Sequence, residues 1–137
     1  LASATQLRSL SLRRCCIGGW RRARAIARGL AMNTTLTEID LGYNGIGAAA
    51  HSVNAAAMQT PHALSLAVEA LCQALRENRR LRKLGLAHNA LGDNGTSAVL
   101  AAVIASTIVE LDLRFNGVSV PALQALCAAL GAEGARW

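Results

Sequence analysis

Three histidines, four cysteines and eight acidic residues are the side chains in this sequence that could bind a metal or catalyse a reaction. His51, His62 and His88 fall in no zinc-binding, nucleophile-elbow or phosphate-loop motif. Asp40 and Asp112 occupy equivalent places in two separate copies of the pattern described below, and we do not expect them to form an acid–base pair. The sequence therefore predicts no enzyme activity, no cofactor, no bound metal and no small-molecule substrate.

The four cysteines, Cys15, Cys16, Cys72 and Cys127, have neither C-x-x-C spacing nor the arrangement of a secreted disulfide framework. We expect reduced thiols in an intracellular protein, with the cytoplasm as the expected compartment and an organelle as the alternative. The charge-free segment 94–109 has sixteen residues, fewer than the roughly 20 of a membrane-spanning helix. We therefore expect no membrane association.

The candidate residues lie on a pattern, L-x-x-L-x-L-x-x-N-x-L, that occurs four times, with starts at residues 7, 36, 81 and 108. In the first copy Cys15 stands where the other copies have asparagine. The interval between the second and third starts is longer than the others by about 17 residues, which we interpret as an insertion over about 48–64. Its alanines and Thr60-Pro61 predict a short helix or compact loop that ends before the proline.

Apolar residues between the copies recur at i, i+3, i+4 and i+7, which predicts a helix after each strand. The positions are Ala23, Ile26, Ala27 and Leu30; Val68, Leu71, Cys72 and Leu75; Val99, Ala102 and Val103; and Leu123, Leu126, Cys127 and Leu130. This register predicts that Cys72 and Cys127 are buried and leaves Cys16 as the exposed thiol.

With Leu91, Gly92, Gly95 and Val99 continuing the third copy, the chain resembles the ribonuclease-inhibitor-type leucine-rich repeats. The resemblance implies an α/β solenoid of about four repeats in a single domain, 1–137, with a parallel sheet on the concave side and helices on the convex side. Departures are the insertion, a missing residue around 105–107 and a last unit without a polar cap. We expect the chain to be part of a longer protein or assembly.

The asparagines of the pattern, Asn44, Asn89 and Asn116, are expected to bridge backbone groups of neighbouring units. Side chains between the core leucines should point to the concave surface, where aromatic residues flanked by charges are typical of protein interfaces. The predicted partner-binding residues are Arg13, Arg14, Asp40, Tyr43, His88, Asp112, Arg114 and Phe115.

Excess positive charge is confined to residues 1–35, which contain seven arginines and no acid. The outer face of the first helix should carry Arg21, Arg22, Arg24 and Arg28. There they could contact RNA or an acidic protein, a neighbouring protein domain, or only solvent. We therefore predict a non-catalytic protein-interaction scaffold, with an unidentified protein as partner and RNA as a secondary possibility. The alternatives are a regulator of a small GTPase, similar to the Ran-GTPase activators, and a ribonucleoprotein subunit that contacts RNA through the basic first repeat.

Overall fold

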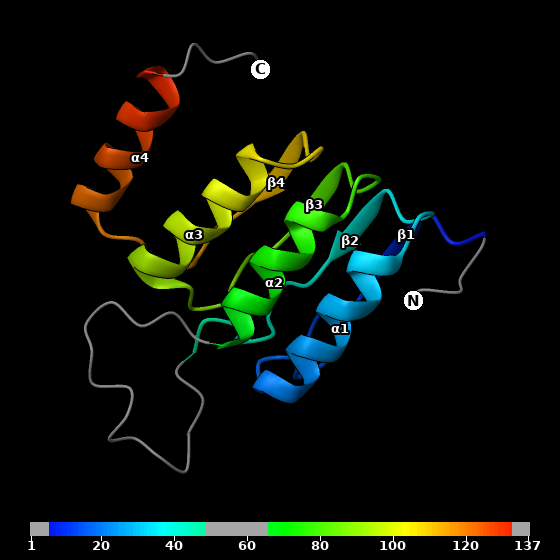
Figure 1. Ribbon diagram of the computed structural model, residues 1–137. Coiled ribbons are helices and arrows are strands. Elements are labelled where there is room, and N and C mark those ends of the chain that lie inside the picture. The colour runs from blue at the N-terminus through cyan, green and yellow to red at the C-terminus, as the bar shows by residue number, and fades with distance from the viewer. Residues whose placement is uncertain (1–5, 49–65, 133–137) are drawn as a thin grey trace.

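Strands and helices alternate along the chain in the computed structural model, which describes residues 6–48 and 66–132 (Figure 1). The strands are β1 (Ser9–Ser11), β2 (Glu38–Asp40), β3 (Lys83–Gly85) and β4 (Glu110–Asp112). The helices are α1 (Trp20–Met32), α2 (Leu66–Glu77), α3 (Gly92–Ile104) and α4 (Val120–Ala132). The strands are parallel and pair in the order β1-β2-β3-β4.

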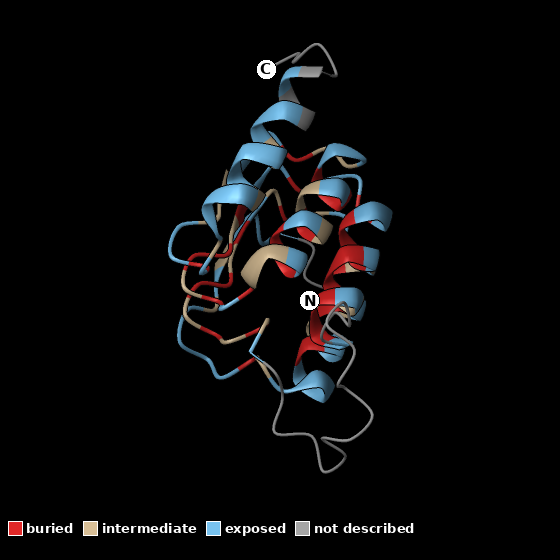
Figure 2. Cartoon of the chain, turned by 90° about the vertical axis from the view of Figure 1, so that its left-hand side faces the viewer, coloured by how far each residue is buried: buried red, intermediate tan, exposed pale blue. Residues whose placement is uncertain are grey.

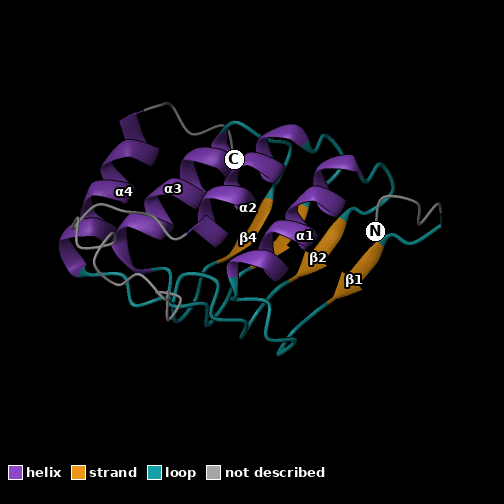
Figure 3. Ribbon diagram, turned by 60° about the horizontal axis from the view of Figure 1, so that its bottom comes forward, coloured by secondary structure: helices purple, strands orange, loops and turns teal. Residues whose placement is uncertain are grey.

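The sheet forms one layer and the helices form the other (Figure 3). Helices need a spacing of 8–10 Å, whereas hydrogen-bonded strands lie about 4.8 Å apart, so a stack of such units curves with its sheet on the inner side. The predicted α/β solenoid is confirmed. Each strand begins two residues after the start of one copy of the leucine pattern.

The core lies between the two layers, and its buried residues line the inner sides of the helices (Figure 2). The central residues Leu10, Ile39, Leu84 and Leu111 are in register across the sheet. The largest fully buried apolar side chains are Leu30, Leu36, Ile39, Leu41, Ile46, Val68, Leu75, Leu81, Leu84, Leu86 and Val99. Burying this apolar surface against neighbouring units is what holds each short strand in place.

A tight turn follows each strand and contains two residues in the left-handed region. The first of these is Arg14, Tyr43, His88 or Phe115, with φ between 55° and 59°, and the second is Cys16, Gly45, Ala90 or Gly117. Non-glycine residues occupy this region at an energetic cost. The same turn in all four units therefore requires compensating contacts.

The asparagines provide those contacts and bridge neighbouring units as predicted. Asn44 Oδ1 accepts hydrogen bonds from the backbone N–H groups of Cys15 (2.9 Å) and Ile17 (3.2 Å). Its Nδ2 donates to the backbone oxygens of Leu12 and Leu41, both at 2.8 Å. Asn89 and Asn116 repeat this arrangement with the units that precede them.

A second polar position, just after the helix, fixes the backbone that leads to the next strand. Asn78 Oδ1 accepts from the N–H groups of Arg80 and Leu81, and its Nδ2 donates to Leu30 oxygen at 2.7 Å. Around 105–107, where the sequence lacks one residue of the pattern, Ser106 Oγ donates to Val103 oxygen and accepts from Ile108 N–H. A hydroxyl thus replaces the carboxamide in the shorter connection.

Three expectations need correction or fall outside the described residues. Cys72 is buried, and burial raises the pKa of its thiol, but Cys127 is exposed, as are Cys15 and Cys16. Cys127 is exposed because α4 packs little against α3, whereas α1, α2 and α3 pack against one another in sequence (Figure 2). Of the predicted insertion over 48–64, only residue 48 is described.

Candidate protein-binding surface

Four planar side chains, Arg14, Tyr43, His88 and Phe115, form a continuous row beside the carboxyl ends of the strands. The Tyr43 and His88 rings stack with their centroids 4.0 Å apart and their planes at 15°. The His88 and Phe115 rings stack at 4.3 Å and 19°. The guanidinium groups of Arg14 and Arg13 lie 4.8 Å and 4.7 Å from the Tyr43 centroid. The row thus begins with cations and ends with Phe115.

The row follows from the backbone because its members occupy the same turn position in successive units. In each unit this position comes immediately before the bridging asparagine, or before Cys15 in the first unit. Parallel strands in register lie about 4.8 Å apart, which places equivalent planar groups at stacking distance. Each stacked aromatic pair contributes about 0.5–1.5 kcal/mol beyond the burial of its surface. Phe115 remains 72% exposed, so the last face of the row is open to a partner.

Charged residues of the same sheet face form pairs beside the row. Arg13 Nη1 lies 3.2 Å from Asp40 Oδ2. Arg114 donates from Nε and Nη2 to the two oxygens of Asp112, and these hydrogen bonds lower the pKa of Asp112 to about 2. The same contact raises the pKa of Arg114.

A third pair joins β3 and β4, where Lys83 Nζ lies 2.9 Å from Glu110 Oε2 and its hydrogen bond raises the pKa of Lys83. Exposed pairs of this kind contribute little to stability because solvent screens them. Their value for binding is a fixed pattern of charge, because each charged group is held at a defined place on the sheet.

A hollow crosses β2, β3 and β4 around Gly85, and its polar lining is Glu38, Asp40, Lys83, Glu110 and Asp112. The hollow depends on glycine, because a Cβ at residue 85 would come within 2.8 Å of Asp40 Oδ1. Asp40 and Asp112 lie on either side of β3, and each carboxylate accepts hydrogen bonds from its own arginine. The two carboxylates therefore serve separate ion pairs.

The basic residues predicted as a second contact surface lie on α1, in the helix layer. Arg21, Arg22, Arg24 and Arg28 are all exposed. Arg22 Nη1 donates to Cys16 oxygen at 2.9 Å, and the Arg24 guanidinium lies 5.8 Å from the Trp20 ring centroid.

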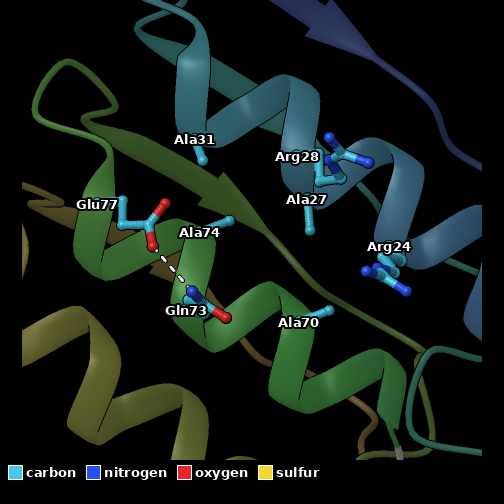
Figure 4. A pocket seen from close by; sticks show the side chains of 8 residues that line it. All are labelled: Arg24, Ala27, Arg28, Ala31, Ala70, Gln73, Ala74 and Glu77. Atoms are coloured by element: carbon cyan, nitrogen blue, oxygen red, sulfur yellow. Dashed lines mark hydrogen bonds between the residues drawn. The ribbon is translucent and has the colours of Figure 1, made fainter.

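Arg24 and Arg28 also border a groove between α1 and α2 (Figure 4). Alanines of both helices line it, and Gln73 and Glu77, joined by a 2.9 Å hydrogen bond, lie on the α2 side. The structure thus brings the concave residues together and separates them from the four arginines.

The family model described as "Leucine Rich repeat" matches residues 33–49, 77–100 and 105–127. The chain is a leucine-rich-repeat protein. A solved structure described as the tropomodulin C-terminal domain from Caenorhabditis elegans superposes with a TM-score of 0.61, covering 93% of this chain and 84% of that one at 13% identity. This likeness shows the fold alone. No curated protein matches the sequence significantly.

The family match begins at residue 33, yet the first leucine-rich-repeat unit has the same strand register and turn as the others. Stacked repeats form extended binding surfaces, so the chain is a protein-interaction scaffold in this general sense. In the ranges 6–48 and 66–132, no helix is long and apolar enough to cross a membrane, and no cluster of three potential metal ligands occurs.

The sequence predicted all four members of the row as partner-binding residues, but it did not predict that their side chains stack. A sequence signal for the stacking was present, because an arginine or an aromatic residue immediately precedes the asparagine position of the pattern in every unit. The Gly85 hollow was also missed, since a glycine between two strands of acidic residues shows its effect only when the strands are paired. Ala87 also lies between core leucines, where the pattern predicts a side chain on the concave surface, but it is only 5% exposed.

Proposed function

We propose that this leucine-rich-repeat protein is a non-catalytic scaffold that binds a protein partner on its concave face. The observation that carries the proposal is the planar row of Arg14, Tyr43, His88 and Phe115, which ends in a largely exposed ring. Aromatic and arginine side chains dominate binding energy in protein interfaces. The paired charges of the sheet would set the orientation of the partner.

The side chains of the row are ordered before any partner binds, which supports this function. A side chain immobilised on binding costs about 0.5–1.5 kcal/mol in entropy, but Tyr43 and His88 are already held between neighbouring planar groups. Their ordering is achieved by folding, so a partner that covers the row gains contact area at a smaller entropic cost.

The proposal extends to membership of a larger assembly in a reducing compartment, the cytoplasm. Val120 and Leu123 of α4 are 68% and 55% exposed, and apolar residues of a repeat helix are normally covered by a neighbour. The four cysteines are free thiols, which suits a reducing environment.

The test is selection of binding peptides from a random display library against the 137-residue protein, followed by affinity measurement on two variants. Phe115→Ala removes the open ring of the row. Met32→Ala is the matched control, because Met32 is 67% exposed but lies on helix α1. We expect the selected peptides to bind Phe115→Ala at least about tenfold more weakly, as a hot-spot truncation implies, and to bind Met32→Ala unchanged. Peptides that lose affinity only for Met32→Ala would overturn the proposal.

A second candidate function, contact with RNA or an acidic protein, has one specific observation in its favour. Arg21, Arg22, Arg24 and Arg28 are exposed on α1, and residues 1–35 contain no acid. Binding of single-stranded RNA that weakens steeply with salt, and that is lost in an Arg24→Ala, Arg28→Ala double variant, would support this alternative. A GTPase-stimulation assay separates both functions from regulation of a small GTPase.

A further inference from the structure

At the open end of the sheet, the backbone that follows β4 presents four N–H donors that have no acceptor within the described residues. They belong to Leu113, Phe115, Asn116 and Val118, which follow the last strand of the sheet. An unpaired strand edge is a template for another strand. The question is which segment would satisfy all four donors at once.

The three junctions between the units of this chain answer it, because each one pairs the same four donors. Between units two and three, Leu41 and Tyr43 donate to the backbone oxygens of Gly85 and Ala87 at 2.8 and 2.9 Å. Asn44 and Ile46 donate to Asn89 Oδ1 at 3.1 and 3.2 Å. The junctions on either side repeat this set.

An occupant of the β4 edge must therefore supply two backbone oxygens two residues apart, followed by a side-chain oxygen. Asn116 and Val118 correspond to Asn44 and Ile46, so their N–H groups should point to a single acceptor position. The residue before that acceptor would lie over Phe115, as His88 lies over Tyr43.

A second copy of the chain does not meet this requirement. Its first unit offers Ser11 and Arg13 backbone oxygens and the planar Arg14 side chain, but Cys15 stands at the acceptor position. A thiol is a weak acceptor and lacks the reach of a carboxamide. Stacking of a second copy would pair two of the four donors and leave the N–H groups of Asn116 and Val118 without partners.

We propose that the β4 edge binds a strand-and-turn segment of another protein in which an aromatic or arginine residue directly precedes asparagine. The segment runs parallel to β4, its asparagine accepts from Asn116 and Val118, and its planar side chain covers Phe115. The exposed Val120 and Leu123 of α4 provide apolar surface for a helix that follows such a segment. This site extends beyond the concave face, with Phe115 shared between the two.

The test is an NMR titration of the whole 137-residue protein with a capped peptide that has the sequence of residues 81–91, which contains His88-Asn89. The matched peptide has alanine in place of that asparagine. We expect the asparagine peptide at millimolar concentration to shift the amide signals of Asn116 and Val118 and to slow their hydrogen exchange. The alanine peptide should bind about tenfold more weakly, because it lacks the shared acceptor. The amides of Asn44 and Ile46 should not change.

Unchanged Asn116 and Val118 amides, or equal binding of the two peptides, would overturn the proposal. Protection of these amides without peptide, together with concentration-dependent sedimentation, would make a second copy the occupant and would overturn it as well. A Phe115→Leu variant should bind the asparagine peptide severalfold more weakly than the wild type does. It should still bind the asparagine peptide more tightly than the alanine peptide. The amide readout keeps this test independent of binding on the concave face, because peptides that cover only the sheet leave the edge amides in fast exchange.

Discussion

Replacement of Asn89 by alanine tests the central physical claim, that side-chain carboxamides hold successive units together. Asn89 is fully buried, at 0% exposure. Its Oδ1 accepts from the N–H groups of Asn44 and Ile46, and its Nδ2 donates to the oxygens of Leu41 and Leu86 at 3.0 Å each. Nδ2 also donates to Ala87 oxygen at 3.3 Å. Alanine removes all five hydrogen bonds and leaves space where the carboxamide was.

The expected loss of stability follows from which groups keep another partner. Leu41 oxygen still accepts from Asn44 Nδ2, and Leu86 oxygen still accepts from Asn116 Nδ2. The two N–H donors lose this acceptor, and a buried donor without its acceptor costs about 1–3 kcal/mol. With two such donors, we expect Asn89→Ala to lower the free energy of unfolding by about 2–6 kcal/mol.

The assay is urea unfolding followed by circular dichroism, with Arg80→Ala as the control. Arg80 is exposed and lies directly before the start of the third copy, nine residues before Asn89, so its truncation should change stability by less than about 0.5 kcal/mol. With a denaturant dependence of about 2 kcal/mol per molar urea, the Asn89→Ala midpoint should fall by about 1–3 M. Equal midpoints for the two variants would refute the reasoning.

Two further predictions concern close packing and pH. Gly18→Ala should destabilise the protein by about 1–3 kcal/mol, since its Cβ would lie 2.4 Å from Gly45 oxygen, whereas Gly19→Ala, with nothing within 4 Å, should leave the urea midpoint nearly unchanged; equal midpoints would contradict this. Because the folded pKa of Asp112 is lowered to about 2, its stabilisation should be complete above pH 4 and disappear as the pH falls toward 2. Since Arg114 is exposed, the effect should stay below about 1 kcal/mol, measured as a steeper loss of stability in the wild type than in Asp112→Asn; identical pH profiles would exclude it.

The repeat fold could be predicted because its determinants are local. Leucines at fixed spacing define the strand, a period of 3.6 defines the helix, and the asparagine marks the turn between them. The bridging role of Asn44 was predictable for the same reason: a buried turn at an inner curve leaves backbone groups that only a nearby polar side chain can satisfy. Burial of Cys72 was predictable from helix register, and the same register failed for Cys127 because burial also requires a neighbouring unit.

The sequence by itself determined which residues form strands, turns and helices, and most of the side chains that face the concave surface, because periodicity along the chain fixes these properties. Only the tertiary structure decided how units meet. The stacking of Tyr43 on His88 joins residues 45 positions apart, and it arises from strand register rather than from any local pattern. The hollow at Gly85 and the open donors beside β4 have the same origin. They are properties of pairing between strands, and pairing becomes definite only when the apolar faces of the units are buried together.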